Sequence, residues 1–389
     1  MEIKDFSFVV MGLCGAYAGT AAAIDPASMK IGEMAFTPQV WVQLSHNDNI
    51  FTEETDTNSS FITLLNPSVD FRVEKGNRAF RLNYDLKQGI IHSSSADNYT
   101  DHRLTGEAIF EMNSRNQLNL TAGVNLIHED RGSTDASTGD EPSVYNDNSI
   151  AGTYLYGAKS AQGNLELTAS YLDHQYTNFA AANDGRDRDN LRLGATFFYN
   201  VAPKTQALFE VRHEQINYKQ SSSTLDNDEQ KYLVGVKWDA TAKSSGSAKI
   251  GATRKTYDAT TRSNQSGISW EVATLWEPQT YSSFELETSQ EYDEASGSED
   301  AVDTQNLSLT WTHSWSERVS TNAMLSDMNE DYLGLNREDK TDSVALSVDY
   351  ELQRWLSVNL GYAHADSDSD ITGESYKDNQ FMVTLRASL

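Results

Sequence analysis

The side chains best suited to chemistry in this chain are its histidines, its many carboxylates and its single cysteine. Five of the eight histidines lie in separate segments with no local catalytic motif: His128, His174, His213, His313 and His364. A hydrolase needs a nucleophile beside an oriented histidine. The lone cysteine, Cys14, lies in an N-terminal apolar run. We therefore expect no catalytic residue and no enzyme activity.

Two acidic segments, 184–189 and 226–229, have the composition of calcium-binding loops. Neither has the spacing of such a loop, in which aspartate or asparagine alternates towards a glycine and a distal glutamate follows. We therefore expect no specific metal site and no cofactor.

Charge and the N-terminal residues limit where the protein acts. With 57 acidic and 30 basic side chains the formal charge is −27, which makes nucleic acid an improbable partner. Residues 1–23 have the pattern of a secretory signal peptide, an apolar run followed by small residues at 20–23. We expect a mature chain that begins near Ile24, with residues 24–35 as a periplasmic N-terminal segment.

Alternation of apolar and polar residues dominates the rest of the chain. It is clear over 80–87, 104–112, 118–126, 191–199 and 344–352. A period of two over this length indicates a β-strand with one apolar and one polar face. No comparable helical stripe appears, so the sequence predicts an all-β protein.

The breaks between these segments are alternately short and long. Short breaks resemble Glu74–Asn77, whereas long acidic breaks fall near 130–147, 329–341 and 366–377. Eight short and nine long breaks join eighteen segments. This pattern is typical of outer-membrane barrels. We predict a transmembrane antiparallel up-and-down β-barrel of about 18 strands over residues 36–389, in the bacterial outer membrane, with both termini periplasmic and Gln380–Leu389 paired to the first strand.

Aromatic residues support a membrane location. Eight of them lie on the apolar face near strand ends, as expected of rings at lipid headgroups. These predicted lipid-interface aromatics are Tyr156, Tyr171, Tyr199, Trp238, Trp276, Trp315, Tyr350 and Tyr362.

The opposite faces of the strands carry charges of both signs. Charges in a dry interior are costly, but a barrel of sixteen to eighteen strands encloses water. We therefore predict a polar pore, in which each charge is either solvated or paired on the wall. The candidate pore-lining residues are Arg81, Asp85, Lys87, Glu107, Glu111, Arg192, Glu210, Arg212, Lys237, Glu271, Glu285, Asp349 and Arg386, with Glu214 and Lys249 on the same faces.

Several short motifs resemble a known family. The segments are Ser45–Phe51, Leu65–Val69, Tyr99–His102, His128–Gly132, Trp238–Lys243 and the closing stretch Trp355–Leu389. They are similar to the family "Putative beta-barrel porin 2", an outer-membrane barrel commonly encoded with exopolysaccharide and capsule genes. The resemblance covers nearly all of the mature chain. It implies export of a polysaccharide, with the pore-lining residues as its contacts, and it brings no metal, cofactor or catalytic residue.

Three functions follow as hypotheses. The first is export of an exopolysaccharide or capsular polysaccharide, with outer-membrane lipid, lipopolysaccharide, the polysaccharide cargo and periplasmic polysaccharide-export proteins as partners. The second is a general or solute-specific uptake porin. Such porins often fold a long loop into the lumen, for which Arg131–Asp147 is the best candidate. The third is a structural or adhesive surface barrel acting through its acidic loops.

Overall fold

The computed structural model describes the chain except residues 1–27, 134–139, 159, 242, 295–297 and 389. The expected signal peptide and Cys14 lie outside the described residues. The strands are β1 (Met29–Ile31), β2 (Met34–Asn47), β3 (Ser60–Lys75), β4 (Arg78–Ile91), β5 (Tyr99–Asn113), β6 (Asn116–Glu129), β7 (Ser143–Tyr156), β8 (Gly163–Tyr176), β9 (Arg188–Ala202), β10 (Thr205–Tyr218), β11 (Asn227–Thr241), β12 (Ser244–Tyr257), β13 (Gln265–Gln279), β14 (Ser282–Asp293), β15 (Ala301–Ser316), β16 (Val319–Leu333), β17 (Glu338–Gln353), β18 (Leu356–Ser369) and β19 (Tyr376–Ser388). Short helical turns are η1 (Ser95–Asp97), α1 (Ala180–Asn183) and η2 (Asp184–Arg186).

The strands from β2 to β19 form a closed barrel. Each strand pairs with the next in antiparallel order, and β19 returns to β2 with Ala387 opposite Val40 and Val383 opposite Leu44. Closure leaves no unpaired edge, as a barrel in lipid requires. The predictions of an eighteen-stranded antiparallel barrel and of pairing between the last and first strands are confirmed.

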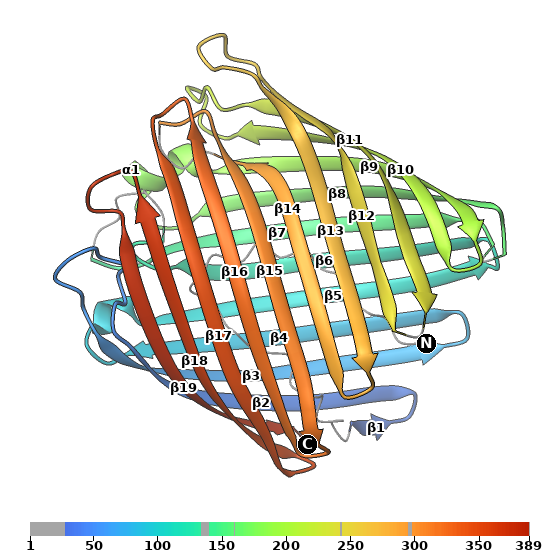
Figure 1. Cartoon of the computed structure of the whole chain (residues 1–389), viewed down its shortest axis with the longest axis horizontal. Helices are drawn as coiled ribbons and strands as arrows, with labels where there is room; N and C mark the ends of the chain where they lie inside the picture. Colours follow the sequence, from blue (N-terminus) through green and yellow to red (C-terminus); the bar gives the residue numbers. More distant parts are fainter. Residues whose placement is uncertain (1–27, 134–139, 159, 242, 295–297, 389) are drawn as a thin grey trace.

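The connections at the two ends of the barrel differ in length. Short turns lie at one end, such as Gly76–Asn77 between β3 and β4, where Gly76 has a φ of +63° that suits a two-residue hairpin. Long loops, which include α1, gather at the upper left of Figure 1. We call these the short-turn end and the long-loop end. The free ends of β2 and β19 both lie at the short-turn end, and placing that end in the periplasm remains a prediction.

The strands are longer than the sequence predicted at the long-loop end. Residues 143–147 belong to β7, β18 continues to Ser369, and only 334–337 separate β16 from β17. The expected breaks at 130–147, 329–341 and 366–377 were therefore too long. Apolar and polar residues alternate along a strand only where one of its faces meets lipid. Strand pairing that continues outside the membrane therefore leaves no such alternation in the sequence. The segment expected to precede the barrel contributes β1, which pairs with β2.

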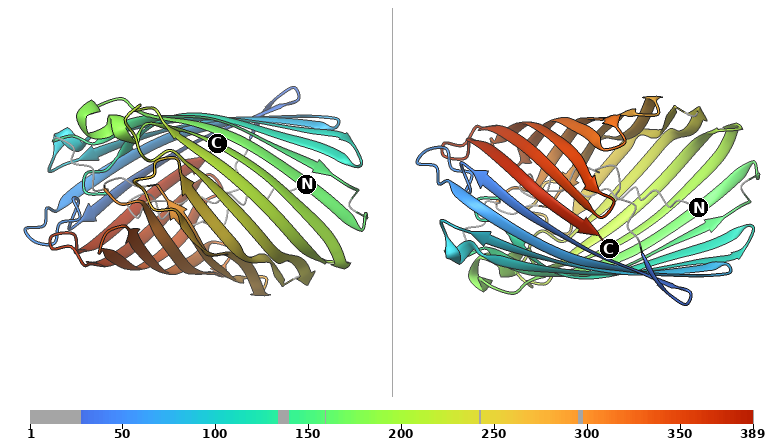
Figure 2. Two further views of the ribbon diagram at one scale, coloured as in Figure 1. Left: turned by 90° about the horizontal axis from the view of Figure 1, so that it is seen from above. Right: turned by 90° about the horizontal axis from the view of Figure 1, so that it is seen from below.

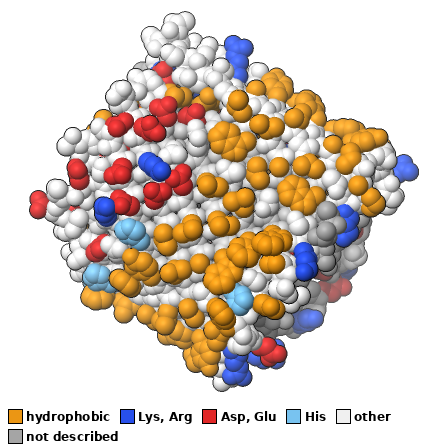
Figure 3. Space-filling model, in the orientation of Figure 1, with side chains coloured by type: hydrophobic (Ala, Val, Ile, Leu, Met, Phe, Trp, Pro, Cys, Tyr) orange, Lys and Arg blue, Asp and Glu red, His pale blue; other side chains and the backbone are white. Residues whose placement is uncertain are grey.

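An apolar belt surrounds the barrel. On β11, β12 and β13 its members include Val234, Ile250 and Ile268, each more than half exposed. Figure 3 shows this belt across one face of the molecule, with carboxylates gathered beyond it towards the long-loop end. On the outer face, Asp327, Asp342 and Asp366 stand opposite one another on β16, β17 and β18, and we call them the carboxylate row.

The inner face of the barrel is polar. The wall formed by β15–β19 faces the wall formed by β3–β7 across the barrel (Figure 2). None of the described helices is long and apolar enough to span a membrane.

Candidate functional site

The candidate pore-lining residues all lie on the faces opposite the apolar belt. On β11, for example, Lys237 alternates with the exposed Val234 and the half-buried Trp238. Except for Glu285, which is on β14, these residues fall into three stretches of wall, which differ in how their charges are paired. Whether any of them contacts a solute remains a proposal.

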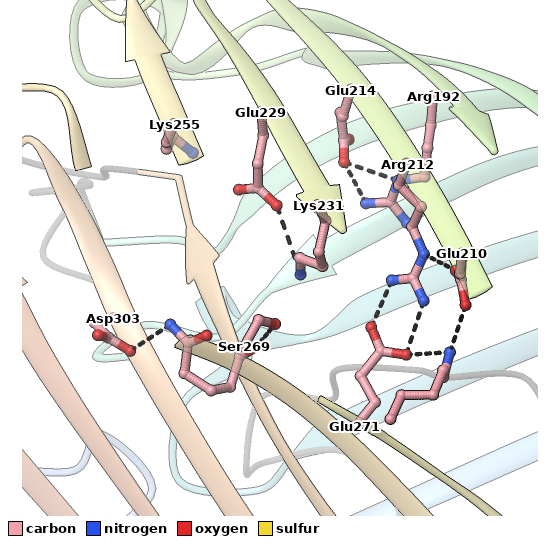
Figure 4. A network of polar contacts seen from close by, with 12 residues as sticks. Arg192, Glu210, Arg212, Glu214, Glu229, Lys231, Lys255, Ser269, Glu271 and Asp303 are labelled. Carbon is pink, nitrogen blue, oxygen red and sulfur yellow. Dashed lines mark hydrogen bonds and ion pairs between the residues drawn. The ribbon is translucent and has the colours of Figure 1, made fainter. Parts of the chain in front are cut away.

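The densest stretch is a lumen charge cluster on β9–β13 (Figure 4). Its centre is Arg212 of β10, which donates two hydrogen bonds to Glu271 of β13 at 2.6 and 2.8 Å and a third to Glu210. Lys249 of β12 contacts the same two carboxylates, at 3.0 Å to Glu210 and 2.5 Å to Glu271. Two cations and two carboxylates therefore alternate, and every charge has two partners of opposite sign.

The contact between Arg212 and Glu271 spans two other strands of the wall. Arg212 and Glu271 are on strands separated by β11 and β12, so their side chains meet over two intervening strands. At Gly235 and Gly251 a Cβ atom would collide with backbone of the neighbouring strand. Glycine in a strand permits such close approach of two backbones. These glycines therefore leave no side chain between the two backbones beside Lys249 of the cluster.

Further pairs extend the cluster towards the long-loop end. Arg192 of β9 binds Glu214 of β10 at 2.5 Å, and Lys231 of β11 lies 3.6 Å from Glu229. Lys255 of β12, which is 1% exposed, forms an ion pair with Glu294. The Arg192 side chain is 56% exposed, so its ion pair with Glu214 contributes less to stability than the buried ion pairs at the centre of the cluster.

A second charged stretch lies on β3–β5. Arg81 bonds to Asp70 and approaches Glu107 at 3.8 Å. Asp85 lies 3.8 Å from Arg103. The remaining candidate residues of this stretch are Lys87, whose ammonium lies 5.5 Å from the centroid of the Tyr99 ring, and Glu111, which is exposed.

The third stretch, on β15–β19, is lined mainly by hydroxyl and amide groups. Asp349 accepts hydrogen bonds from Asn322 at 3.2 Å and Asn359 at 2.9 Å, and lies 3.6 Å from Arg386. Thr341 donates to Ser367 at 3.0 Å. Two charged stretches and one largely uncharged stretch therefore surround the lumen.

Six members of the charged stretches were missed by sequence reasoning: Asp70, Arg103, Glu229, Lys231, Lys255 and Glu294. Glu229 and Glu294 fell within expected loops, and the other four were not assigned to a face. Alternation through 227, 229, 231 and 233 would have placed the β11 pair on the inner face.

The predicted interface aromatics lie on the outer surface or close to it. Six of the eight are exposed, including Trp276 at 52% and Trp315 at 62%. Trp238 and Tyr362 are half-buried, with hydrogen bonds from the Trp238 ring nitrogen to Ser244 and from the Tyr362 hydroxyl to Asn379. Their contact with lipid headgroups remains a prediction.

The proposed constriction loop is only partly a loop. Its end, 143–147, is strand, and residues 134–139 lie outside the description. Its beginning packs at the mouth of the barrel, where Arg131 makes two hydrogen bonds of 2.6 Å to Asp97 and Thr52 donates to the carbonyl of Gly132 at 2.8 Å. Residues 143–147 are therefore part of the wall, and a constriction formed by the rest of the segment remains a prediction.

A second ion pair fixes the helical loop between β8 and β9. Arg186 of η2 binds Glu129 through two hydrogen bonds of 2.9 and 2.8 Å. Burial alone lowers the pKa of Arg186, but its hydrogen bonds to Glu129 outweigh that effect and raise the pKa. The guanidinium stays charged, so this link persists at any physiological pH.

The chemistry of the site is electrostatic. In the described part of the chain, no group of three or more histidine, cysteine or acidic side chains could hold a metal ion. The lumen instead offers fixed charges and hydrogen-bonding groups to solutes that pass through water.

Several solved structures have a similar fold. OccK1 (OpdK) of Pseudomonas aeruginosa has a TM-score of 0.54 and 11% identity, over 91% of this chain and 99% of that one. OccK11 (OpdR) of the same organism has a TM-score of 0.50 and 11% identity, over 91% and 96%. The FrpB iron transporter of Neisseria meningitidis has a TM-score of 0.48 and 10% identity, and this chain spans 62% of its length.

Family membership comes from sequence. No curated protein matches the chain significantly. A family model described as "Putative beta-barrel porin 2" matches residues 22–389, which is nearly the whole chain. The family and the similar structures are porins and transporters, not enzymes, and place the protein in the bacterial outer membrane. The chain belongs to the "Putative beta-barrel porin 2" family of outer-membrane β-barrels.

Proposed function

We propose that this protein is a passive uptake channel for small water-soluble solutes, with a preference for cations. The observation that carries the proposal is an excess of carboxylates on the inner face of a closed eighteen-stranded barrel. A barrel of this size encloses water, and lumen carboxylates raise the local concentration of cations.

The excess is clearest on β14. Beside the charge cluster, whose members neutralise one another, β14 carries Glu287, Glu291 and Asp293 on its inner face. Among the described residues no lysine or arginine forms an ion pair with any of these three, although Asp293 accepts a hydrogen bond from Thr304 at 2.6 Å. Glu287 is exposed and free to attract a passing cation.

The alternatives are less well supported. Export of a polysaccharide, which the resemblance implied, is not supported by the comparisons, and an uptake porin fits them better. OpdK of Pseudomonas aeruginosa has a structure with vanillate, so a related barrel accepts a small organic solute. Vanillate is an anion, and the acidic lumen of the present protein argues for solutes of the opposite charge. A structural or adhesive role remains an untested hypothesis.

Reversal potentials test the proposal. We expect the purified protein to conduct in planar bilayers and, under a KCl gradient, to show a potassium-to-chloride permeability ratio above one. The double variant Glu287→Gln, Glu291→Gln should lower that ratio. Asp342→Asn, which removes a carboxylate from the outer face, is the matched control and should leave it unchanged. A closed barrel, or one that prefers chloride, would overturn the proposal.

A further inference from the structure

A pocket lies inside the barrel at the long-loop end, where the first and last strands meet. Its wall comes from β2, β3, β4, β18 and β19, and the segment 48–59 contributes its roof. It encloses about 740 Å³, including the part open to solvent. We call it the mouth pocket.

One side of the mouth pocket is apolar. Ile50 and Phe51 come from the roof segment, and Ile62 and Ile91 come from β3 and β4. Ile91 is buried, so this side is held firmly by the barrel wall. These bulky apolar side chains face the water-filled lumen and therefore do not contact lipid. They offer a surface that would shelter the hydrocarbon part of a solute.

The β19 side carries a carboxylate without a counter-ion. Asp378 of β19 accepts a hydrogen bond from Asn47 at 3.1 Å through one oxygen, while its other oxygen, Oδ1, is buried and has no hydrogen-bond partner. In the described chain, no lysine, arginine or histidine side chain forms an ion pair with Asp378. His364 contacts the backbone carbonyl of Asp378, not its carboxylate. Asp378 lines the pocket without a counter-ion, so a positively charged donor beside its carboxylate would be stabilised.

The other charged groups of the mouth pocket are already paired. Arg131 is bound to Asp97 and stacks on Phe51, with its guanidinium carbon 4.1 Å from the ring centroid. Asp130 contacts His128 at 3.0 Å. The pocket therefore holds one neutralised guanidinium and an excess of negative charge, which disfavours an anionic solute.

We propose that the mouth pocket binds organic ammonium compounds, with the cationic group beside Asp378 and the apolar body against Phe51, Ile62 and Ile91. The inference rests on the proposed function only in that bound solute then continues through the lumen. Binding itself can be measured without transport. Failure of the mouth pocket to bind the ligand can therefore be distinguished from failure of the channel to prefer cations.

Calorimetry on the full-length protein in detergent micelles tests this inference. The probes are 2-phenylethylammonium, its neutral analogue 2-phenylethanol and the anion 3-phenylpropanoate, which share an aromatic ring and a short chain. We expect the ammonium compound to bind at least about 10-fold more tightly than the alcohol, because a hydrogen bond to a charged group is worth about one to two powers of ten. The anion should bind most weakly.

Asp378→Asn should remove this preference and weaken binding of the ammonium compound about 10-fold or more. The control is Asp366→Asn on the outer face, where Asp366 is bound to Lys377 at 2.7 Å, and it should leave binding unchanged. Equal binding of the alcohol and the ammonium compound to the unmodified protein would overturn the inference, even if the Asp378 variant failed to fold. An unaltered affinity in a folded Asp378→Asn variant would overturn it too.

Discussion

Replacing Arg212 by methionine isolates the centre of the lumen charge cluster. Methionine replaces the aliphatic stem of the side chain but lacks the guanidinium, so it removes the charge and all hydrogen-bond donors. Glu271 and Glu210 then lose their bonds to the guanidinium and share the single ammonium of Lys249. The perturbation therefore leaves two adjacent carboxylates with one counter-charge.

The expected loss of stability in Arg212→Met depends on how deeply Arg212 and its two carboxylate partners are buried. The Arg212 side chain is 25% exposed, and each of its two carboxylate partners is 10% exposed. A hydrogen bond to a charged group contributes about 1.5–3 kcal/mol, and breaking a buried ion pair costs about 3–5 kcal/mol. Because Lys249 still neutralises part of the charge and lumen water can enter, we expect Arg212→Met to lower the free energy of unfolding by about 2–4 kcal/mol.

Urea unfolding in lipid vesicles, followed by tryptophan fluorescence, measures this change. Arg192→Met is the matched control, because Arg192 also faces the lumen and pairs with a glutamate but is 56% exposed. An exposed pair contributes about 0–1 kcal/mol. Equal losses from the two variants, or no loss from Arg212→Met, would show that the cluster is not a structural link and would refute the reasoning.

Three further changes test the outer face and the wall. Trp276→Arg should reduce the folded fraction on heat-modified electrophoresis, with a cost of about 0–1 kcal/mol if the residue lies at the lipid interface and about 2–4 if it lies at midplane, whereas Trp276→Phe should fold normally. Gly251→Ala should lower the free energy of unfolding by about 1–3 kcal/mol; Gly106→Ala should do little, because the nearest atom to its Cβ is a side-chain methyl of Leu82 at 3.9 Å. Asp342→Asn should change the free energy of unfolding by less than about 1 kcal/mol, because its neighbours in the carboxylate row, Asp327 and Asp366, are already bound to Lys340 at 3.2 Å and Lys377 at 2.7 Å. Unchanged folding of Trp276→Arg, equal effects of the two glycine variants, or a larger effect of Asp342→Asn would contradict the respective argument.

The barrel could be predicted from the sequence because two signals reinforce each other. Alternation between lipid and lumen gives each strand a face, and the contrast between short turns and long loops gives the strands their order. Strand ends could not be predicted in the same way. Residues such as Asp342 and Asp366 pair in register where both faces of the sheet meet water, so nothing apolar marks them.

The site could be predicted only in part. Alternation assigns Arg212 and Glu271 to the lumen, but nothing in their spacing shows that they meet across two strands. That contact crosses β11 and β12 and depends on the order and register of four strands, which are properties of the folded wall. The mouth pocket is still less visible from the sequence, because it joins Ile50, Asp378 and residues of four further strands.

The pairing pattern separates two uses of charge in one lumen. Charges that are held by two partners, such as Arg212 and Glu271, gain their stabilisation from each other and present little net field to a solute. Charges without a counter-ion, such as Glu287 and Asp378, produce an electrostatic potential in the lumen that acts on passing solutes. Removing a paired charge should therefore change stability most, and removing an unpaired one should change permeation or binding most. The same chemical group is structural in the first case and functional in the second, and its partners decide which.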